Sequence, residues 1–359
     1  MAAPTRIALI GYGFVGKTFH APLIAAVDGL ELTVVASRDA DKVHADLPAV
    51  EVIADAYRAV ADEHVDLVVI ASPNDTHAPL ARAALEAGKH VVVDKPFTLD
   101  LAAARELAAL AARHGRVLSV FQNRRWDSDY LGVRQVIEQG LLGRLAHVES
   151  HFDRFRPEPR VRWRESAGAG GGLWYDLGPH LIDQALQLFG LPQRIQAHMA
   201  IQRDGGQATD WAQVLLDYGS LRVILHASML VAGGGARFIL HGSRGSLLKP
   251  LADRQEAQLL AGVRPGAAGW GEDPDDMLFY DGSGQVSRLP TPAGDQRRYY
   301  AMLRDALCGQ GANPVSPLQA ITVMAVLEAA IEAATSGRSV TLSLSDEERG
   351  AWPHRSAQA

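Results

Sequence analysis

Five short apolar runs alternate with alanine-rich amphipathic segments between Arg6 and Val120. The runs read RIALI, LTVVA, DLVVIA, KHVVV and RVLSV. Runs this apolar are typical of strands buried on both faces, and segments such as Asp75–Ala87 and Asp100–His114 are long enough for helical crossovers. This alternation is the βαβ pattern of a parallel sheet. We therefore predict a doubly wound, Rossmann-like domain over residues 1–123.

The pattern changes after residue 123, where polar and apolar residues begin to alternate. Such alternation predicts a sheet with one face open to solvent, mostly antiparallel, at 145–155, 211–217, 221–229 and 237–240. Helical periodicity predicts helices at 128–139, 179–189, 295–308 and 317–335. The glycine- and proline-rich stretch 262–284 is predicted to be loop, and the tail after Ser345 is predicted to be frayed. Residues 124–359 are thus predicted to form a second α/β domain, for substrate binding and oligomerisation.

Composition excludes several classes of function. The 359 residues carry 35 basic and 41 acidic side chains, so the formal net charge of -6 gives no general attraction for nucleic acid or an anionic membrane. The single cysteine, Cys308, cannot form an intrachain disulfide, and neither CxxC nor HExxH occurs. We find no apolar stretch of the ~18 residues that a membrane span needs and no signal peptide. A soluble cytoplasmic protein is predicted.

A glycine-rich loop follows directly after the first apolar run. Gly11, Gly13 and Gly16 form G-Y-G-F-V-G between a predicted strand and a predicted helix. The three glycines respectively permit a tight turn, approach of the backbone to a pyrophosphate, and close packing of helix on strand. The helix N-terminus adds free N–H groups and a partial positive charge. This context predicts a dinucleotide site, whereas the glycines alone are also compatible with a simple turn.

The residues at the end of the second run decide which dinucleotide binds. An NAD site usually presents an acidic residue there for the ribose hydroxyls, whereas the 2′-phosphate of NADP needs a cation and small donors. Ser37 and Arg38 fit NADP. Asp39 fits the ribose of NAD, or else caps the following helix. We predict NADP in preference to NAD.

Two segments carry groups suited to acid–base chemistry. Lys95, in D-K-P, follows the run KHVVV at the carboxyl end of a strand, where open α/β sheets bind ligands. Pro179 is best tolerated in the first turn of a helix, so we predict that a helix begins near His180. Asp176 then lies just before this helix. A histidine at a helix N-terminus favours its neutral form and suits a general base. Structural alternatives are a solvated lysine, an N-cap aspartate and a buried histidine.

No metal site is predicted. His147 and His151 are four residues apart in an alternating strand and so share a face, but a metal pair is not expected without carboxylates arranged nearby. The neighbouring charged residues Asp153, Arg154 and Arg156 either bind substrate hydroxyl groups or form a solvated strand face.

The motifs together resemble one enzyme family. They are GYGFVGKTFHAPLI, SPNDTH, VVVDKPFTLD, FQNRRWDSDY, ESHFDRFRPE and GGGLWYDLGPHLIDQ. This combination, from Arg6 to about Leu342, resembles the Gfo/Idh/MocA oxidoreductases, and more closely their scyllo-inositol dehydrogenase-like branch. The family usually has Glu where this chain has Asp94. The resemblance implies a Rossmann domain, a C-terminal α/β domain with an open sheet, and a homodimer or homotetramer built through that sheet.

The resemblance also implies roles for individual residues. Lys95, Asp176 and His180 match the family's catalytic residues. The residues that match its cofactor site are the loop Gly11, Tyr12, Gly13, Phe14, Val15 and Gly16, then Pro73, Asn74 and His77, and then Gln122, Asn123 and Arg124. Trp163 with Arg164 resembles a pair that reaches the cofactor or the substrate. Lys95 belongs to both sets.

The predicted function is hydride transfer between NAD(P) and a secondary alcohol of a polyol, most simply an inositol. A sugar or anhydrosugar reductase of the same family would share every motif. A nucleotide-sensing regulator without turnover is a different class of protein, but it has no need of Lys95 and His180 together. The expected partner is a small polyol or sugar, with neither nucleic acid nor membrane.

Overall fold

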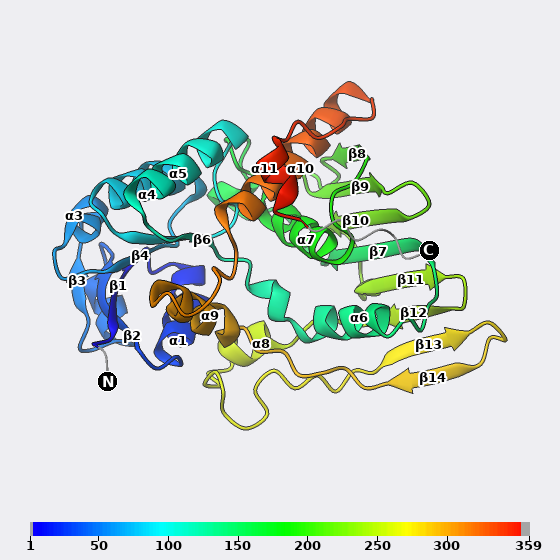
Figure 1. Ribbon diagram of the computed structural model, residues 1–359, viewed down its shortest axis with the longest axis horizontal. Coiled ribbons are helices and arrows are strands. Elements are labelled where there is room, and N and C mark those ends of the chain that lie inside the picture. Colours follow the sequence, from blue (N-terminus) through cyan, green and yellow to red (C-terminus); the bar gives the residue numbers. More distant parts are fainter. Residues whose placement is uncertain (1–2, 353–359) are drawn as a thin grey trace. The chain divides into compact units, whose positions relative to one another are not determined.

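The apolar runs of the N-terminal part form a six-stranded parallel sheet in the computed structural model, which describes residues 3–352 (Figure 1). Its strands are β1 (Thr5–Ile10), β2 (Leu30–Ala36), β3 (Glu51–Ile53), β4 (Leu67–Ile70), β5 (His90–Val93) and β6 (Leu118–Val120), in the order β3-β2-β1-β4-β5-β6. All pairs are parallel. The four residues of β4 are fully buried, which explains why this strand shows no polar alternation. The predicted Rossmann-like domain is confirmed.

Helices cover both faces of this sheet. On one side α3 (Ala56–Ala61), α4 (His77–Glu86) and α5 (Leu101–His114) pack on one another, and on the other α1 (Ala21–Ala25) contacts α9 (Arg297–Leu307) (Figure 1). The shorter elements are η1 (Gly16–His20), α2 (Ala40–His44), η2 (Asn74–Thr76), η3 (Asn123–Trp126) and α8 (Gln255–Leu260). Local signals set the limits of α5, because Asp100 accepts a hydrogen bond from Ala103 N at its start and left-handed Gly115 ends it.

The two compact units of the chain are not divided at a single point. The first comprises residues 1–123, 255–271 and 295–321, and the second comprises 124–254, 272–294 and 322–359. The sequence-based division assigned everything after residue 123 to the second domain. It missed the two later segments because no composition change marks a chain that returns to its first unit. The first of these segments contains α8 and the second contains α9.

The second unit contains an eight-stranded, mostly antiparallel sheet. The strands are β7 (Leu145–Asp153), β8 (Arg194–Ala200), β9 (Trp211–Asp217), β10 (Arg222–Ser228), β11 (Phe238–Gly242), β12 (Gly245–Lys249), β13 (Met277–Asp281) and β14 (Val286–Leu289), in the order β14-β13-β12-β11-β7-β10-β9-β8. Only β7 and β10 pair in parallel. The predicted C-terminal α/β domain is confirmed.

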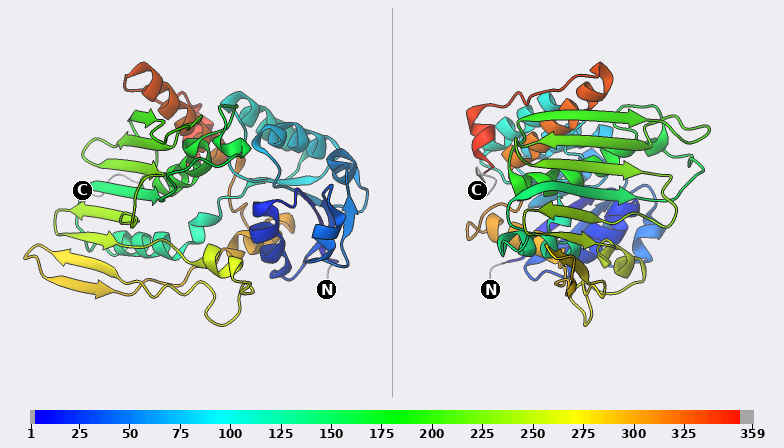
Figure 2. Two further views of the ribbon diagram at one scale, coloured as in Figure 1. Left: turned by 180° about the vertical axis from the view of Figure 1, so that it is seen from behind. Right: turned by 90° about the vertical axis from the view of Figure 1, so that its right-hand side faces the viewer.

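One face of this sheet is apolar and the other is polar. Along β10, Val223, Leu225 and Ala227 are buried, while Ile224 and His226 between them are partly exposed. The right-hand view of Figure 2 shows the strands in front and the helices of the same unit behind them. These helices are α6 (Ser128–Glu138), α7 (Leu173–Phe189), α10 (Pro317–Ser336) and α11 (Asp346–Gly350), with the short turn η4 (Trp163–Glu165).

Several sequence-based expectations about this unit are wrong. The predicted loop 262–284 contains β13, which pairs with β14 in a hairpin. Its short apolar run MLFY was missed because glycine, proline and aspartate residues surround it. The tail after Ser345 is not frayed at its start. Ser345 and Glu348 form a capping box that begins α11, while residues 353–359 lie outside the described part of the chain.

The start of α7 also differs from the prediction. The helix begins at Leu173, after left-handed Gly172, so Pro179 lies within it and Asp176 lies in its first turn. His180 is consequently about two turns from the N-terminus, where the helix dipole has little effect. The loss of one backbone hydrogen bond at Pro179 is tolerated because α7 is held by side-chain contacts along its length, described below.

The long helix α10 corrects the expectation about apolar stretches. It is long and apolar enough to cross a membrane by length and composition alone, contrary to the sequence-based expectation that no such stretch exists. Of the apolar 18-residue segment of α10 that meets this criterion, 61% is buried within the protein. Val326, Leu327 and Ala330 are completely buried, as in the core helix of a soluble protein.

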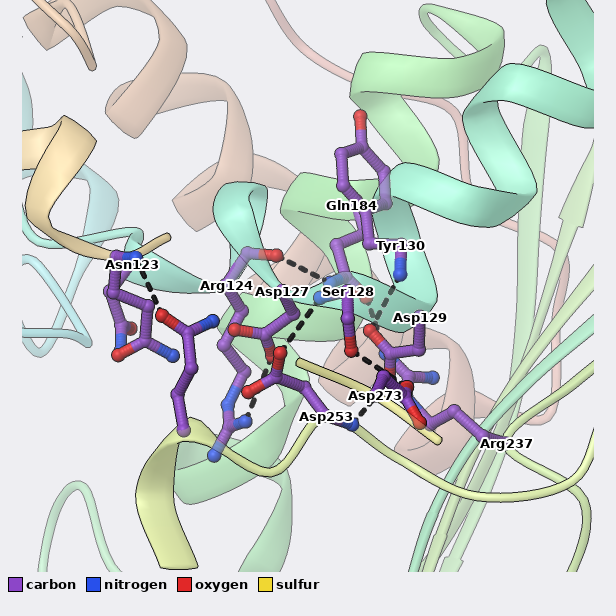
Figure 3. Close-up of polar contacts among 12 residues, drawn as sticks. Asn123, Arg124, Asp127, Ser128, Asp129, Tyr130, Gln184, Arg237, Asp253 and Asp273 are labelled. Atoms are coloured by element: carbon purple, nitrogen blue, oxygen red, sulfur yellow. Dashed lines mark hydrogen bonds and ion pairs between the residues drawn. The ribbon is translucent and has the colours of Figure 1, made fainter. Parts of the chain in front are cut away.

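A buried polar network holds the second unit together (Figure 3). Arg237, before β11, is 2% exposed and donates to Asp129 of α6 (2.9 Å), Ser150 of β7 (2.7 Å) and Gln184 of α7 (2.5 Å). Ser128 adds hydrogen bonds to Asp253 and Asp273, both 2.8 Å, and Asp273 pairs with completely buried Lys249. Because each buried charge has an opposite charge and further hydrogen bonds, the network joins α6, α7 and the sheet.

We predict that His20 makes the first unit sensitive to acid. The ring is completely buried, lies 4.2 Å from the Phe121 ring and bonds Tyr300 Oη at 2.6 Å. Burial lowers the pKa of His20 to about 4, although Asp94 opposes the shift. Between this value and the ordinary ~6.5, the unfolded chain binds one proton more than the folded chain, so stability falls as the pH falls through this window.

The measurement is urea unfolding at pH 7 and pH 5. Between pH 7 and pH 5 the free energy of unfolding of the wild type should fall by about 2 kcal/mol more than that of His20→Gln, because the variant lacks the group that takes up this proton. Equal losses in both proteins would show that His20 is protonated in the folded state or that another group dominates.

Candidate active site

The glycine loop leaves β1 at the carboxyl edge of the parallel sheet. Gly11 has φ of 101°, and a Cβ there would lie 2.8 Å from the carbonyl oxygen of Ala71, after β4. A Cβ on Gly16 would overlap the carbonyl oxygen of Gly11, whereas one on Gly13 would have no atom within 4 Å. The fold itself therefore requires Gly11 and Gly16. The space beside Gly13 is open, which fits the close approach of a pyrophosphate to the backbone.

The other loop residues divide between the core and the solvent. Tyr12 is buried and donates to Asp46 at 3.2 Å, and Val15 is half-buried. Phe14 is exposed, and Lys17 N bonds the carbonyl of Gly13 at 3.0 Å. The loop therefore has a stable conformation of its own, with Gly13 and Phe14 on its outer side.

The end of β2 resolves one of the sequence alternatives. Asp39 Oδ1 accepts a hydrogen bond from Lys42 N at 3.0 Å, so the carboxylate caps α2. The Ser37 hydroxyl bonds backbone atoms of Asp39 at 3.1 and 3.2 Å. Arg38 is exposed. The helix-capping interpretation of Asp39 is therefore confirmed, and an exposed guanidinium group lies at the strand end.

The loops after β4 and β5 are joined by a histidine. The buried ring of His77 lies between two carbonyl oxygens, Nδ1 at 2.8 Å from Pro96 and Nε2 at 3.0 Å from Ser72. Pro73 and buried Asn74 form the start of η2 beside them. Because both ring nitrogens face the protein backbone, the imidazole of His77 has a positioning role in these two loops.

Lys95 lies two residues after the end of β5 in the same unit. The strand ladder continues through the bond from Asp94 N to Ile70 O at 2.8 Å, and the peptide bond from Lys95 to Pro96 is cis. Asp94 is buried while Lys95 is half-buried. At the end of β6, Gln122 and Asn123 are also buried, and Asn123 Nδ2 donates to Gln296 at 2.9 Å (Figure 3). The first unit thus assembles the glycine loop, the β4 loop and Lys95 along one sheet edge.

The second unit contains the other predicted residues. Asp176 and His180 are four positions apart on α7 and so lie on one helix face. His180 is 5% exposed, and its ring meets Phe152 edge-on at 6.5 Å between centroids. Asp176 Oδ1 lies 3.8 Å from Nε of Arg164, whose guanidinium lies 4.6 Å from the Trp163 ring centre.

A small cavity of about 10 Å³ adjoins Asp176, on the scale of a single water molecule. Its lining combines five charged side chains with apolar and small residues. It consists of Arg162, Arg164, Glu165, Gly172, Leu173, Asp176, Arg203, Ala208, Thr209 and Met229. Trp163 and Arg164 are therefore grouped with Asp176 within this unit, as the sequence could not show.

Three sets of contacts hold α7 in place. Asp183 forms two hydrogen bonds with the Arg125 guanidinium, at 2.8 and 2.6 Å. Gln184 binds Arg237 and, through Nε2, the carbonyl of Arg124 at 2.9 Å (Figure 3). These polar residues just after His180 were missed by sequence reasoning, although buried polar residues in an apolar helix are a usable signal.

Two family profiles match the chain. The profile described as the NAD-binding Rossmann fold of the oxidoreductase family matches residues 5–122, and that of its C-terminal alpha/beta domain matches residues 134–342. Both carry the family designation GFO_IDH_MocA. The chain belongs to the Gfo/Idh/MocA oxidoreductases. Membership makes this Gfo/Idh/MocA protein an NAD(P)-dependent oxidoreductase with a small-molecule substrate, as the sequence predicted.

Similar proteins extend over nearly the whole chain. "Uncharacterized oxidoreductase YdgJ" of Escherichia coli is 53% identical over 93% of this chain and 97% of its own length. "scyllo-inositol 2-dehydrogenase (NADP(+)) IolW" of Bacillus subtilis is 33% identical over 94% and 96%. The crystal structure of a candidate oxidoreductase from Klebsiella pneumoniae is 63% identical, covers 98% of both chains and has a TM-score of 0.92.

We predict that Gly13→Val keeps the fold but weakens binding of NAD(P). A Cβ at this position has no protein atom within 4 Å, so the new side chain is directed into the space beside the loop. Calorimetric titration should give a Kd at least about tenfold higher, a loss of about 1.4 kcal/mol, with unchanged circular dichroism. The control is Gly350→Val, which also meets no protein atom within 4 Å but lies in α11. Unchanged affinity of Gly13→Val would mean that the dinucleotide does not lie on this loop.

Proposed function

We propose that the protein oxidises a secondary alcohol of a polyol, most simply an inositol, and reduces the corresponding ketone in reverse. The observation that carries this proposal is the pair Asp176 and His180 on one face of the firmly held helix α7. Lys95, at the edge of a dinucleotide-binding sheet, supplies the complementary cation. The similarity to IolW, named as an NADP-dependent scyllo-inositol 2-dehydrogenase, supports an inositol as substrate.

Each of the three residues has a distinct proposed role. In oxidation, His180 accepts the hydroxyl proton as general base. The Lys95 ammonium group binds the same oxygen and stabilises the negative charge that develops on it, or polarises the ketone in the reverse direction. Asp176 orients the imidazole or binds a neighbouring hydroxyl group. Bound nicotinamide supplies the hydride acceptor for oxidation and the hydride donor for reduction.

The basicity of His180 does not depend on a helix dipole, because the residue lies well inside α7. Its burial and its edge-on contact with the Phe152 ring restrict the positions that its imidazole can take. Asp176 lies 3.8 Å from the guanidinium of Arg164, so a carboxylate and a cation stand together on the side of α7 that carries His180.

NADP is proposed as the preferred cofactor. Asp39 caps α2, and Arg38 is exposed at the end of β2 with Ser37 beside it. A guanidinium and a hydroxyl are the donors that a 2′-phosphate needs.

We also propose a cytoplasmic homodimer or homotetramer assembled through the uncovered sheet face. The polar, partly exposed side of the eight-stranded sheet supports this assembly. Light scattering of the purified protein would measure its mass in solution, and a mass near 38.6 kDa would contradict the proposal.

The function is tested by an absorbance screen at ~340 nm with inositols and aldoses, each with NAD and NADP. Turnover of an inositol supports the proposed substrate class. Turnover of aldoses alone would instead assign a sugar dehydrogenase, and no turnover with any alcohol would contradict the proposal.

Lys95→Ala and His180→Ala should each lose turnover while binding NAD(P) normally. Charge stabilisation and general base catalysis each contribute roughly 10²–10⁴-fold to a rate. The measurements are steady-state kcat and calorimetric cofactor affinity, with exposed His198→Ala of β8 as the control. Near wild-type kcat in either variant would remove that residue from the mechanism. Asp176→Asn should be impaired too, in kcat if it orients His180 and in KM if it binds substrate.

Arg38→Ala should raise KM for NADP about tenfold or more while leaving KM for NAD nearly unchanged. A hydrogen bond to a charged group contributes about 1.5–3 kcal/mol, which corresponds to that preference. Arg58→Ala, which removes another exposed arginine of the same unit, is the matched control. A wild-type enzyme that favours NAD and is indifferent to Arg38→Ala would contradict the NADP proposal.

A further inference from the structure

A cluster of imidazoles and carboxylates lies on the uncovered face of the eight-stranded sheet. His147, Glu149, His151 and Asp153 alternate with residues of the opposite face along β7. The neighbouring strand β10 pairs with β7 in parallel and places His226 directly beside His151. Because alternate residues of a strand point to the same side, these five side chains share one face.

Three of these residues converge on one point. Asp153 Oδ1 lies 2.9 Å from His226 Nδ1, and Asp153 Oδ2 lies 3.3 Å from His151 Nδ1. One donor atom from each of the three residues lies within 4.8 Å of the others. Tetrahedral bonds of 2.0–2.2 Å to a metal separate neighbouring ligand atoms by about 3.3 Å, so the arrangement needs little adjustment to accept an ion.

The ring of His151 is oriented from its other side. Its Nε2 lies 2.8 Å from Glu149 Oε2, and the second oxygen of Glu149 bonds His147 Nε2 at 2.8 Å. A carboxylate behind a ligating histidine is the usual outer-shell partner that fixes the ring in metal sites. His226 is held between neighbouring rings, with the Trp211 ring centre at 5.9 Å and the His151 ring centre at 5.0 Å.

All three side chains are largely buried. Only 5% of the Asp153 side chain is exposed, against 17% for His151 and 16% for His226. A carboxylate group thus lies between two imidazole rings, a set of donor groups that suits a transition-metal cation.

We propose that His151, Asp153 and His226 form a binding site for a borderline divalent transition-metal ion, of which Zn²⁺ is the representative. Two imidazole nitrogens and a carboxylate suit Zn²⁺, whereas Mg²⁺ and Ca²⁺ prefer ligand sets of oxygen only. Three protein ligands leave one position for a further ligand, which is water in a single chain or a group of a second copy where assembly covers this face. The ion would connect β7 to β10 on the side of the sheet opposite Phe152 and α7, so the site is distinct from the proposed catalytic residues.

The proposed metal site does not use the pair His147 and His151 that the sequence suggested. His147 and His151 are about 13 Å apart along an extended strand and cannot share an ion. The carboxylates that the pair lacked are provided by Glu149 and Asp153 on the same strand face. The second ligating histidine comes from β10, which the sequence places 75 residues later.

The full-length protein is first freed of metal with a chelator, which is then removed by equilibrium dialysis. Zn²⁺ is titrated into this protein, and binding is measured by calorimetry. We expect one high-affinity site per chain and an increase in Tm with Zn²⁺. Substitution of Co²⁺ should give the visible absorption of a four-coordinate nitrogen–oxygen site. Asp153→Asn and His226→Ala should each weaken binding at least about 100-fold, and Glu149→Gln, which changes an outer-shell residue, about 10–100-fold.

The matched control is His198→Ala, which removes an exposed histidine from the same sheet and should leave Zn²⁺ binding unchanged. Each variant is checked by circular dichroism without metal. Absence of a saturable site in the wild type would overturn the proposal. Binding that survives Asp153→Asn and His226→Ala, or that His198→Ala removes, would also overturn it. None of these readouts uses enzyme activity, so the outcome is independent of the proposed dehydrogenase function.

Discussion

The buried guanidinium group of Arg237 is the interaction on which the second unit depends. It reaches α6 through Asp129, β7 through Ser150 and α7 through Gln184, and so joins three elements at one point. Burial lowers the pKa of Arg237 even though Asp129 opposes the shift. A buried charge with a full set of partners adds little stability over an apolar core, but removal of one partner typically costs about 3–5 kcal/mol. The interaction therefore makes other arrangements of these elements unfavourable.

The consequence for chemistry is a rigid α7. This helix is held by Asp183 and Gln184, immediately after His180, and Pro179 lies in its interior. A general base must lie within a few tenths of an ångström of its working position, so the packing of the helix matters as much as the identity of the histidine. In the first unit, the loops beside Lys95 are held in place by the close contacts of Gly11 and Gly16 and by the hydrogen bonds of His77.

The two faces of the eight-stranded sheet serve different purposes. The apolar face packs against the helices and so fixes α7, while the polar face carries the imidazole and carboxylate cluster around Asp153. Asp153 lies on the uncovered side, where both of its carboxylate oxygens contact histidines. Strand periodicity separates these functions because residues one position apart point in opposite directions.

The sequence alone determined the parallel sheet, the glycine loop, the family and the candidate residues Lys95, Asp176 and His180. These depend on local patterns, namely apolar runs, glycine spacing and short motifs, which are readable without knowing what lies nearby in space. Periodicity also located α6, α9 and α10 to within a few residues, because each buries an apolar face.

Only the tertiary structure decided where α7 begins, that β13 and β14 form a hairpin, and that the chain returns twice to its first unit. The apolar run of β13 is short and lies among glycine, proline and aspartate residues, and a helix can contain a proline when distant side chains hold it. The partners of Arg237, the capping role of Asp39 and the approach of His226 to Asp153 likewise had no local signal beyond residue type. The reason is physical: such contacts join residues far apart in the sequence, and their free energy depends on burial and geometry that exist only in the folded chain.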